Sequence, residues 1–172
     1  GDIFFRYITW GGDGILIGIV CFVFLFVRLR YGILLSLVSF ISAFFVSLLK
    51  QFYDEPRPSR YFAGQDVNWV DGIDLYANHS FPSGHAAAAF TMFLLMSFFF
   101  NNKSLTAVFF VLALLVAISR VYLFQHFLID VWVGSFAEQS LDHFGVVGLH
   151  GSEERRCAGA ELALAKATAV AA

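Results

Sequence analysis

The chain has 172 residues, of which 59% are hydrophobic and only 14% are charged, and it contains 22 phenylalanines. This composition excludes an ordinary soluble domain, in which about a quarter of the residues are charged, and indicates a single membrane domain. The net charge of −2 leaves no basic surplus to neutralise a phosphate backbone, so we expect no nucleic-acid partner. Neither a disulfide nor a metal-ligand spacing is indicated by Cys21 and Cys157.

Four apolar segments predict four membrane helices, because about 20 apolar residues span roughly 30 Å of hydrocarbon and only helices satisfy their own backbone there. The segments are residues 15–29, 33–49, 83–100 and 105–124. A fifth apolar stretch begins at His126, but as a helix it would be only about 18 Å long, too short to span a bilayer unaided. The sequence therefore predicts an all-α, polytopic transmembrane helix bundle with four full membrane helices and a shortened fifth.

The sequence also suggests a domain limit and an orientation. We expect residues 1–147 to form the membrane helical domain and the Gly- and Ala-rich residues 148–172 to lie outside it. If the helices alternate, the short loops "RLRYG" and "NNKS" share one face, and their Arg and Lys residues indicate that this face is cytoplasmic. The polar 51–78 loop then lies on the outer face.

Eight polar or small residues gather at the outer ends of the predicted helices. They are Lys50 and Arg57 after the second helix, Ser83, Gly84 and His85 at the start of the third, Arg120 near the end of the fourth, and His126 and Asp130 in the fifth. A helix N-terminus offers amide donors to an anion, and arginine forks match phosphate oxygens. Together they indicate a site for a multiply charged anion.

Each of these residues also has an ordinary structural explanation. Lys50 and Arg120 can snorkel to the head-group level, Ser83 can cap a helix, and His85 can be an interfacial histidine. The i, i+4 pair of His126 and Asp130 can be a local hydrogen bond. The loop acids are explained as a solvated face; they are Asp54, Glu55, Asp66, Asp71 and Asp74.

The histidines favour chemistry over these separate explanations. A carboxylate that holds one imidazole nitrogen fixes the tautomer and frees the other nitrogen to attack, and His126 with Asp130 has that spacing. His85 is placed to protonate a leaving alkoxide and later to activate water. The sequence contains no metal-ligand cluster or Walker loop, so we expect cationic side chains, without a metal or cofactor, to neutralise a transferring phosphoryl group.

Three motifs, in order and each at a helix end, resemble the signature of the type 2 phosphatidic acid phosphatase superfamily. They read Lys50-x6-Arg57-Pro58, then Pro82-Ser83-Gly84-His85, then Ser119-Arg120-x5-His126-x3-Asp130. The resemblance covers residues 3–137. It implies a bundle of six membrane helices and a metal-independent phosphatase for lipid phosphates or diphosphates. Vanadium haloperoxidases carry the same signature, but they are larger and soluble and fit this chain poorly.

The resemblance also assigns roles to the eight residues. It implies that His126 is the nucleophile that forms a phosphohistidine, that Asp130 orients it, and that His85 is the general acid. It further implies that the phosphate is held by Lys50, Arg57, Ser83, Gly84 and Arg120. In its small size the chain is most similar to the bacterial members of the family, which act on undecaprenyl diphosphate, phosphatidylglycerol phosphate or lipid A. We therefore expect an inner-membrane protein whose site faces the periplasm or exterior.

The sequence differs from the family pattern at both ends, and it is also compatible with two other functions. Family members usually have a helix before the segment that begins "FFRYITWGGDG". Their last helix is also expected to continue in apolar residues, whereas this sequence turns polar at Glu138. One alternative is a membrane protein that binds or transports a phosphate headgroup without hydrolysis; another is a structural remnant with too few helices to close the pocket. In the 59–80 loop, Trp69, Tyr76 and His79 are candidates for headgroup contact, although interfacial anchoring is the favoured explanation for Trp69 and Tyr76.

Overall fold

The structure is a computed structural model that describes residues 1–67, 69–70 and 72–136, and all the regular elements in these residues are helical. In chain order they are α1 (Asp2–Ile8), the 3₁₀ helix η1 (Thr9–Gly12), α2 (Gly14–Val27), α3 (Leu29–Tyr53), α4 (Pro58–Tyr61), α5 (Gly84–Phe100) and α6 (Lys103–Tyr122). Residues 128–136 are also helical and are called the last helix below. The predicted all-α class is confirmed for the described residues. The predicted domain limit at 147 and the tail 148–172 lie outside them.

The predicted number of full membrane spans is confirmed only in part. Within the described residues, the segments 29–61 and 103–122 are long and apolar enough to cross a bilayer. The first predicted span is a 14-residue helix, α2, which is joined to α1 and η1 with a bend of 49°. The third, α5, has 17 residues. Two spans thus meet the length criterion, or three if the bent pair counts as one.

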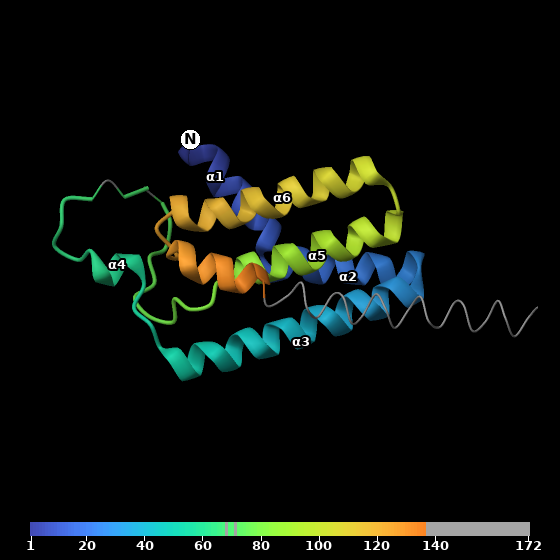
Figure 1. Ribbon diagram of the computed structural model, residues 1–172, viewed down its shortest axis with the longest axis horizontal. Helices are drawn as coiled ribbons and strands as arrows, with labels where there is room; N and C mark the ends of the chain where they lie inside the picture. Colours follow the sequence, from blue (N-terminus) through green and yellow to red (C-terminus); the bar gives the residue numbers. More distant parts are fainter. Residues whose placement is uncertain (68, 71, 137–172) are drawn as a thin grey trace, which may run out of the picture.

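Helix α5 lies at the centre of the bundle and is packed against α2, α3, α6 and η1 (Figure 1). Alanines at positions 86, 87 and 89 are almost fully buried, and such small side chains let neighbouring helices approach closely. Further along α5, Met92 and Leu95 pack against Leu35 and Val38 of α3. On its other side, Phe90 packs with α6 and the last helix. The start of α5 is therefore held inside the protein.

The outer surfaces of the long helices are strongly apolar. Phe22 and Phe26 of α2, Phe40 and Phe44 of α3 and Val108 of α6 are all more than half exposed in the isolated chain. Large apolar patches on a helical surface mark contact with an apolar medium. This pattern, together with the hydropathy of the spans, supports an integral membrane protein.

The two ends of the bundle carry different connections. The tight α2–α3 and α5–α6 connections lie at one end, and α4, the long 54–83 loop and the turn after α6 lie at the other (Figure 1). This is the alternation that the sequence predicts. The end that carries the long loop is called the outer end below.

Local sequence explains where two helices begin. The Asp13 carboxylate accepts a hydrogen bond from Ile15 N at 2.8 Å at the start of α2. At the start of α6, the Asn102 side chain accepts from the backbone N–H groups of Ser104 and Leu105. Both are N-caps that satisfy otherwise unpaired amides. Ser83 occupies the N-cap position of α5, but its side chain makes no cap hydrogen bond, so capping does not account for its hydroxyl.

Two glycines allow backbones to meet at the outer end. A Cβ on Gly12 would overlap the carbonyl of His85, and a Cβ on Gly134 would lie 2.6 Å from the carbonyl oxygen of Ser83. Both contacts are with rigid backbone at the start of α5. Only glycine therefore lets η1 and the last helix close around this helix end.

Replacing Gly12 should loosen that closure. We expect Gly12→Ala to lower the free energy of unfolding by about 1–3 kcal/mol, the usual range for an added methyl in a packed site. Gly14→Ala is the matched control, because nothing lies within 4 Å of a Cβ built there. Thermal unfolding in an uncharged detergent measures both. Equal melting temperatures for the two variants would contradict the close approach.

Candidate active site

The eight residues that the sequence predicts come together at the outer end of the bundle. Lys50 lies in the last turn of α3, Arg57 precedes α4, and Arg120 lies in the last turns of α6. Ser83, the buried N-cap residue, is followed by the half-buried Gly84 and His85 in the first turn of α5. The charges of Arg120, His126, Lys50 and Arg57 all act on His85. The structure thus places all three motifs around one helix end.

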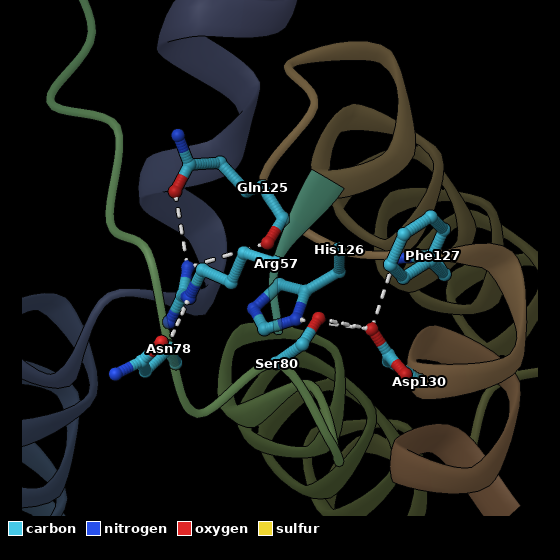
Figure 2. Close-up of polar contacts among 7 residues, drawn as sticks. All are labelled: Arg57, Asn78, Ser80, Gln125, His126, Phe127 and Asp130. Atoms are coloured by element: carbon cyan, nitrogen blue, oxygen red, sulfur yellow. Dashed lines mark hydrogen bonds and ion pairs between the residues drawn. The ribbon is translucent and has the colours of Figure 1, made fainter. Parts of the chain in front are cut away.

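Asp130 ties this site together. Its Oδ2 accepts hydrogen bonds from Ser80 Oγ at 2.5 Å and from Phe127 N at 2.9 Å, and its backbone carbonyl accepts from Ser83 N at 2.9 Å (Figure 2). The same Oδ2 lies 3.7 Å from His126 Nδ1. That distance exceeds a normal hydrogen bond but directs Nδ1 toward the carboxylate. The opposite ring nitrogen, Nε2, is therefore the one left for chemistry.

His126 is buried, with 2% of its surface exposed, in the turn between α6 and the last helix. Burial lowers the pKa of His126 from 6.5 to about 4; Asp130 opposes this shift, and the positive charges of Arg57, Arg120 and Lys50 add to it. The ring is consequently neutral at physiological pH. A neutral imidazole has the lone pair that a nucleophile requires.

Arg57 is fixed by several contacts around its guanidinium. Nε donates to Asn78 O at 2.9 Å, and Nη1 donates to the side-chain and backbone oxygens of Gln125 at 3.1 and 3.3 Å (Figure 2). The guanidinium also lies 5.2 Å from the centre of the Tyr76 ring, within the range of a cation–π contact. These contacts hold one arginine beside His126, since Gln125 is its neighbour in the chain.

Arg120 does not snorkel outward. Its side chain is buried, and Nη1 donates to Thr9 Oγ1 of η1 at 2.8 Å. The backbone carbonyl of Arg120 also accepts from the N–H groups of Gln125 and His126. The N-terminal segment therefore contributes a polar contact to the site, and the turn that carries His126 is bonded to the end of α6.

Some buried polar atoms in this cluster have no hydrogen-bond partner among the described residues. They include Ser83 Oγ, Arg120 Nε and His126 Nδ1. Buried donors in native proteins nearly always have an acceptor. Ser83 and Arg120 flank the amides at the start of α5, so the oxygens of an anion there would satisfy both. The residues present thus fit a phosphate.

A cavity of about 560 Å³ leads away from this cluster between α2, α3 and α5. At one end it is lined by Lys50, Gly84 and His85, and along its length by small or apolar residues such as Gly18 and Ala43. A lipid chain is the kind of molecule that such a lining suits. The cavity therefore joins a cationic cluster to an apolar groove.

Sequence reasoning missed the residues that position the site. Thr9, Ser80 and Gln125 act through tertiary contacts, and no local pattern marks them. Ser80 stands three residues before Ser83, in a stretch explained only as a helix start. Tyr76, considered for a headgroup or an interfacial contact, instead lies against Arg57.

The remaining loop predictions have mixed outcomes. Trp69 packs edge-on against Phe124, and the His79 ring lies 3.2 Å from the Asp54 carboxylate and 3.1 Å from Lys50 O. Asp54 and Asp66 are exposed, as expected for acids on a solvated loop face. Asp71 lies outside the described residues. Within the described residues, no group of three or more His, Cys, Asp or Glu side chains is placed to hold a metal ion.

Comparisons with known proteins identify a family and two similar structures. A family model described as the PAP2 superfamily matches residues 30–137. The crystal structure of LpxE from Aquifex aeolicus is similar, with a TM-score of 0.75 and 28% identity over 84% of each chain. So is that of a transmembrane PAP2 type phosphatidylglycerolphosphate phosphatase from Bacillus subtilis, with a TM-score of 0.68 and 27% identity over 88% of this chain and 77% of that one. A search of curated protein sequences finds no significant match.

The ionisation of His126 can be measured directly. With its pKa near 4, the ring should be neutral at pH 5.5, where an ordinary imidazole is roughly nine-tenths protonated. Ring ¹⁵N shifts of histidine-labelled protein in detergent report this state, and the His126→Gln variant identifies the resonance. A titration midpoint near 6.5 would contradict the buried, neutral ring.

Proposed function

The chain belongs to the PAP2 superfamily, and from this premise we propose that it is an integral-membrane phosphatase that hydrolyses a lipid phosphate or diphosphate through a phosphohistidine intermediate. The observation that supports this most is the set of buried, unpaired donors of Ser83 and Arg120 beside a neutral imidazole. A site for headgroup binding alone needs the donors but not the His126–Asp130 pair.

In the first step, His126 Nε2 attacks the phosphorus and the bond from phosphorus to the lipid oxygen breaks. Asp130 holds Nδ1–H and stabilises the positive charge that develops on the ring. His85 gives its proton to the departing lipid alkoxide. Negative charge on a bound phosphate favours the protonated form of His85 that this step requires.

In the second step, water attacks the phosphorus of the phosphohistidine. His85, now neutral, takes a proton from that water, and the bond between phosphorus and Nε2 breaks. Inorganic phosphate leaves and both histidines return to their starting states. The same group serves as acid and then as base, as expected when two half-reactions mirror each other.

Charge on the transferring group is neutralised by side chains in this proposal. Arg57 and Arg120 offer phosphate oxygens the guanidinium N–H groups that their contacts with Asn78, Gln125 and Thr9 leave free, and Lys50 adds a third positive charge. The amides at the start of α5 and the Ser83 hydroxyl complete the cradle. Donors held in place before the reaction are the main source of stabilisation in such sites. The reaction then requires no metal ion.

The groove between α2 and α3 suits the lipid part of the substrate. Its opening lies along helices whose outer faces are apolar, so a lipid can enter from the bilayer with its phosphate toward Lys50. The Bacillus subtilis relative is described as a phosphatidylglycerolphosphate phosphatase, which makes phosphatidylglycerol phosphate the first substrate to test. Phosphatidic acid, undecaprenyl diphosphate and lipid A complete the panel. The basic loops at the inner end favour an inner-membrane protein whose site faces the periplasm or exterior.

Phosphate release by the purified protein in detergent tests this function. We expect turnover of at least one lipid phosphate to persist in EDTA, because the charge is supplied by Lys50, Arg57 and Arg120. His126→Ala should reduce kcat by about a thousandfold or more, because it removes the nucleophile. Loss of turnover in EDTA that added metal restores would contradict the proposal.

Ser97→Ala is the matched control, since Ser97 Oγ bonds only the local carbonyl of Leu94 among the contacts described and lies toward the inner end of α5. Its activity should equal that of the unmodified chain. Vanadate, which mimics pentacoordinate phosphorus, should raise the melting temperature of the unmodified protein. Full activity in His126→Ala would favour a different nucleophile, and vanadate binding without any turnover would favour the binding or transport function.

A further inference from the structure

A second cavity, of about 620 Å³, lies behind the catalytic carboxylate. Four of the residues that line it are aromatic, Tyr53, Tyr61, Phe81 and Phe127, and two are acidic, Glu55 and Asp130. These residues come from the end of α3, from α4, from the segment before α5 and from the start of the last helix. Apart from Asp130, none belongs to the phosphate site.

The aromatic side chains form two ordered pairs. Tyr53 and Phe81 meet edge to face with ring centres 5.2 Å apart, and Tyr61 and Phe127 do the same at 5.7 Å. Edge-to-face packing holds each ring in a definite orientation. The loop between them is also held, because Ser80 N donates to Glu55 O at 2.9 Å. These contacts keep the aromatic pairs and the loop between them together along the cavity wall.

Both charged residues that line this cavity, Glu55 and Asp130, are acidic. Asp130 is buried and Glu55 is exposed at the rim, while no Lys, Arg or His is among the described residues that line it. Arg57 follows Glu55 by two positions, but its guanidinium is bonded to Asn78 and Gln125. Figure 2 shows these three residues on one side of His126, with Phe127 and Asp130 on the other. A cation entering the cavity thus meets carboxylates and rings.

We propose that this cavity binds an organic ammonium group, primary or quaternary, with the aromatic rings around the cation and Glu55 as its counter-ion. Aromatic rings attract such cations through their negative faces, and a carboxylate at the rim adds to the attraction. An inorganic cation would find few oxygen ligands here, whereas the methyl or methylene groups of an organic ammonium match the rings. The cavity is larger than an ammonium group, so the bound molecule extends beyond its ammonium group.

The position of the cavity allows the ammonium group to come from two kinds of molecule. It lies at the outer end of α3, a helix long and apolar enough to cross a bilayer, so an ammonium can arrive on an amine-bearing lipid headgroup or on a soluble amine. The proposal concerns binding and does not depend on the phosphatase activity. Failure of one therefore leaves the other standing.

Binding of choline to the full chain in an uncharged detergent, measured by isothermal titration, tests the recognition. The comparison ligand is 3,3-dimethylbutanol, which has the same shape without the charge. We expect choline to bind about threefold or more tightly than the alcohol, and Glu55→Gln or Tyr61→Leu to weaken choline binding about two- to fivefold. Asp66→Asn and Tyr7→Leu are matched controls, because both residues are exposed and lie outside the cavity.

A second arm separates the two sources. Protein from vesicles of equal parts phosphatidylethanolamine and phosphatidylglycerol is analysed by native mass spectrometry for retained lipid. Retained phosphatidylethanolamine that is lost in Glu55→Gln assigns the site to a headgroup, and choline binding without retained amine lipid assigns it to a soluble amine. Equal binding of choline and the alcohol, indifference of both variants, or no binding in either arm overturns the proposal.

Discussion

The Asp130 residue holds the outer end of the structure together. Its carboxylate accepts hydrogen bonds from Ser80 Oγ and the Phe127 amide and lies 3.7 Å from His126 Nδ1, and its backbone carbonyl accepts from the amide of Ser83. One residue thereby joins the start of α5, the loop before it and the turn that carries His126. A buried carboxylate is stable only when such partners satisfy it. The geometry of the proposed reaction depends on this junction.

The arrangement explains why the two histidines and the cations occupy the same end. Helix α5 begins inside the bundle, where Gly12 and Gly134 allow η1 and the last helix to approach its first turn. Its amides then face a space bordered by side chains from α3, α6 and the loop. A helix N-terminus in low dielectric favours an anion more strongly than one in water. The fold thus places the helix end of the proposed anion site, and the side chains around it supply the charge.

The sequence predicted which residues gather at the outer end better than it predicted the contacts that hold them there. Hydropathy identified the apolar segments, and the spacing of Arg120, His126 and Asp130 indicated residues that the structure brings together. The number of full spans was less predictable, because hydropathy does not reveal where α2 bends away from η1. Thr9, Ser80 and Gln125 carry no local signal, since each acts on a residue distant in the chain. The second cavity was equally hidden, because Glu55 looks like any exposed loop acid until Tyr61 and Phe127 are placed beside it.

The central claim is that His126 carries the phosphoryl group. The most direct measurement uses a lipid phosphate labelled with ³²P, mixed with the purified chain and quenched in alkali, where a phosphohistidine survives, followed by peptide mapping. The account predicts an acid-labile label on the peptide that contains His126, and no label in His126→Ala. An acid-stable label on another residue, or rapid turnover with no labelled protein at any quench time, would contradict it.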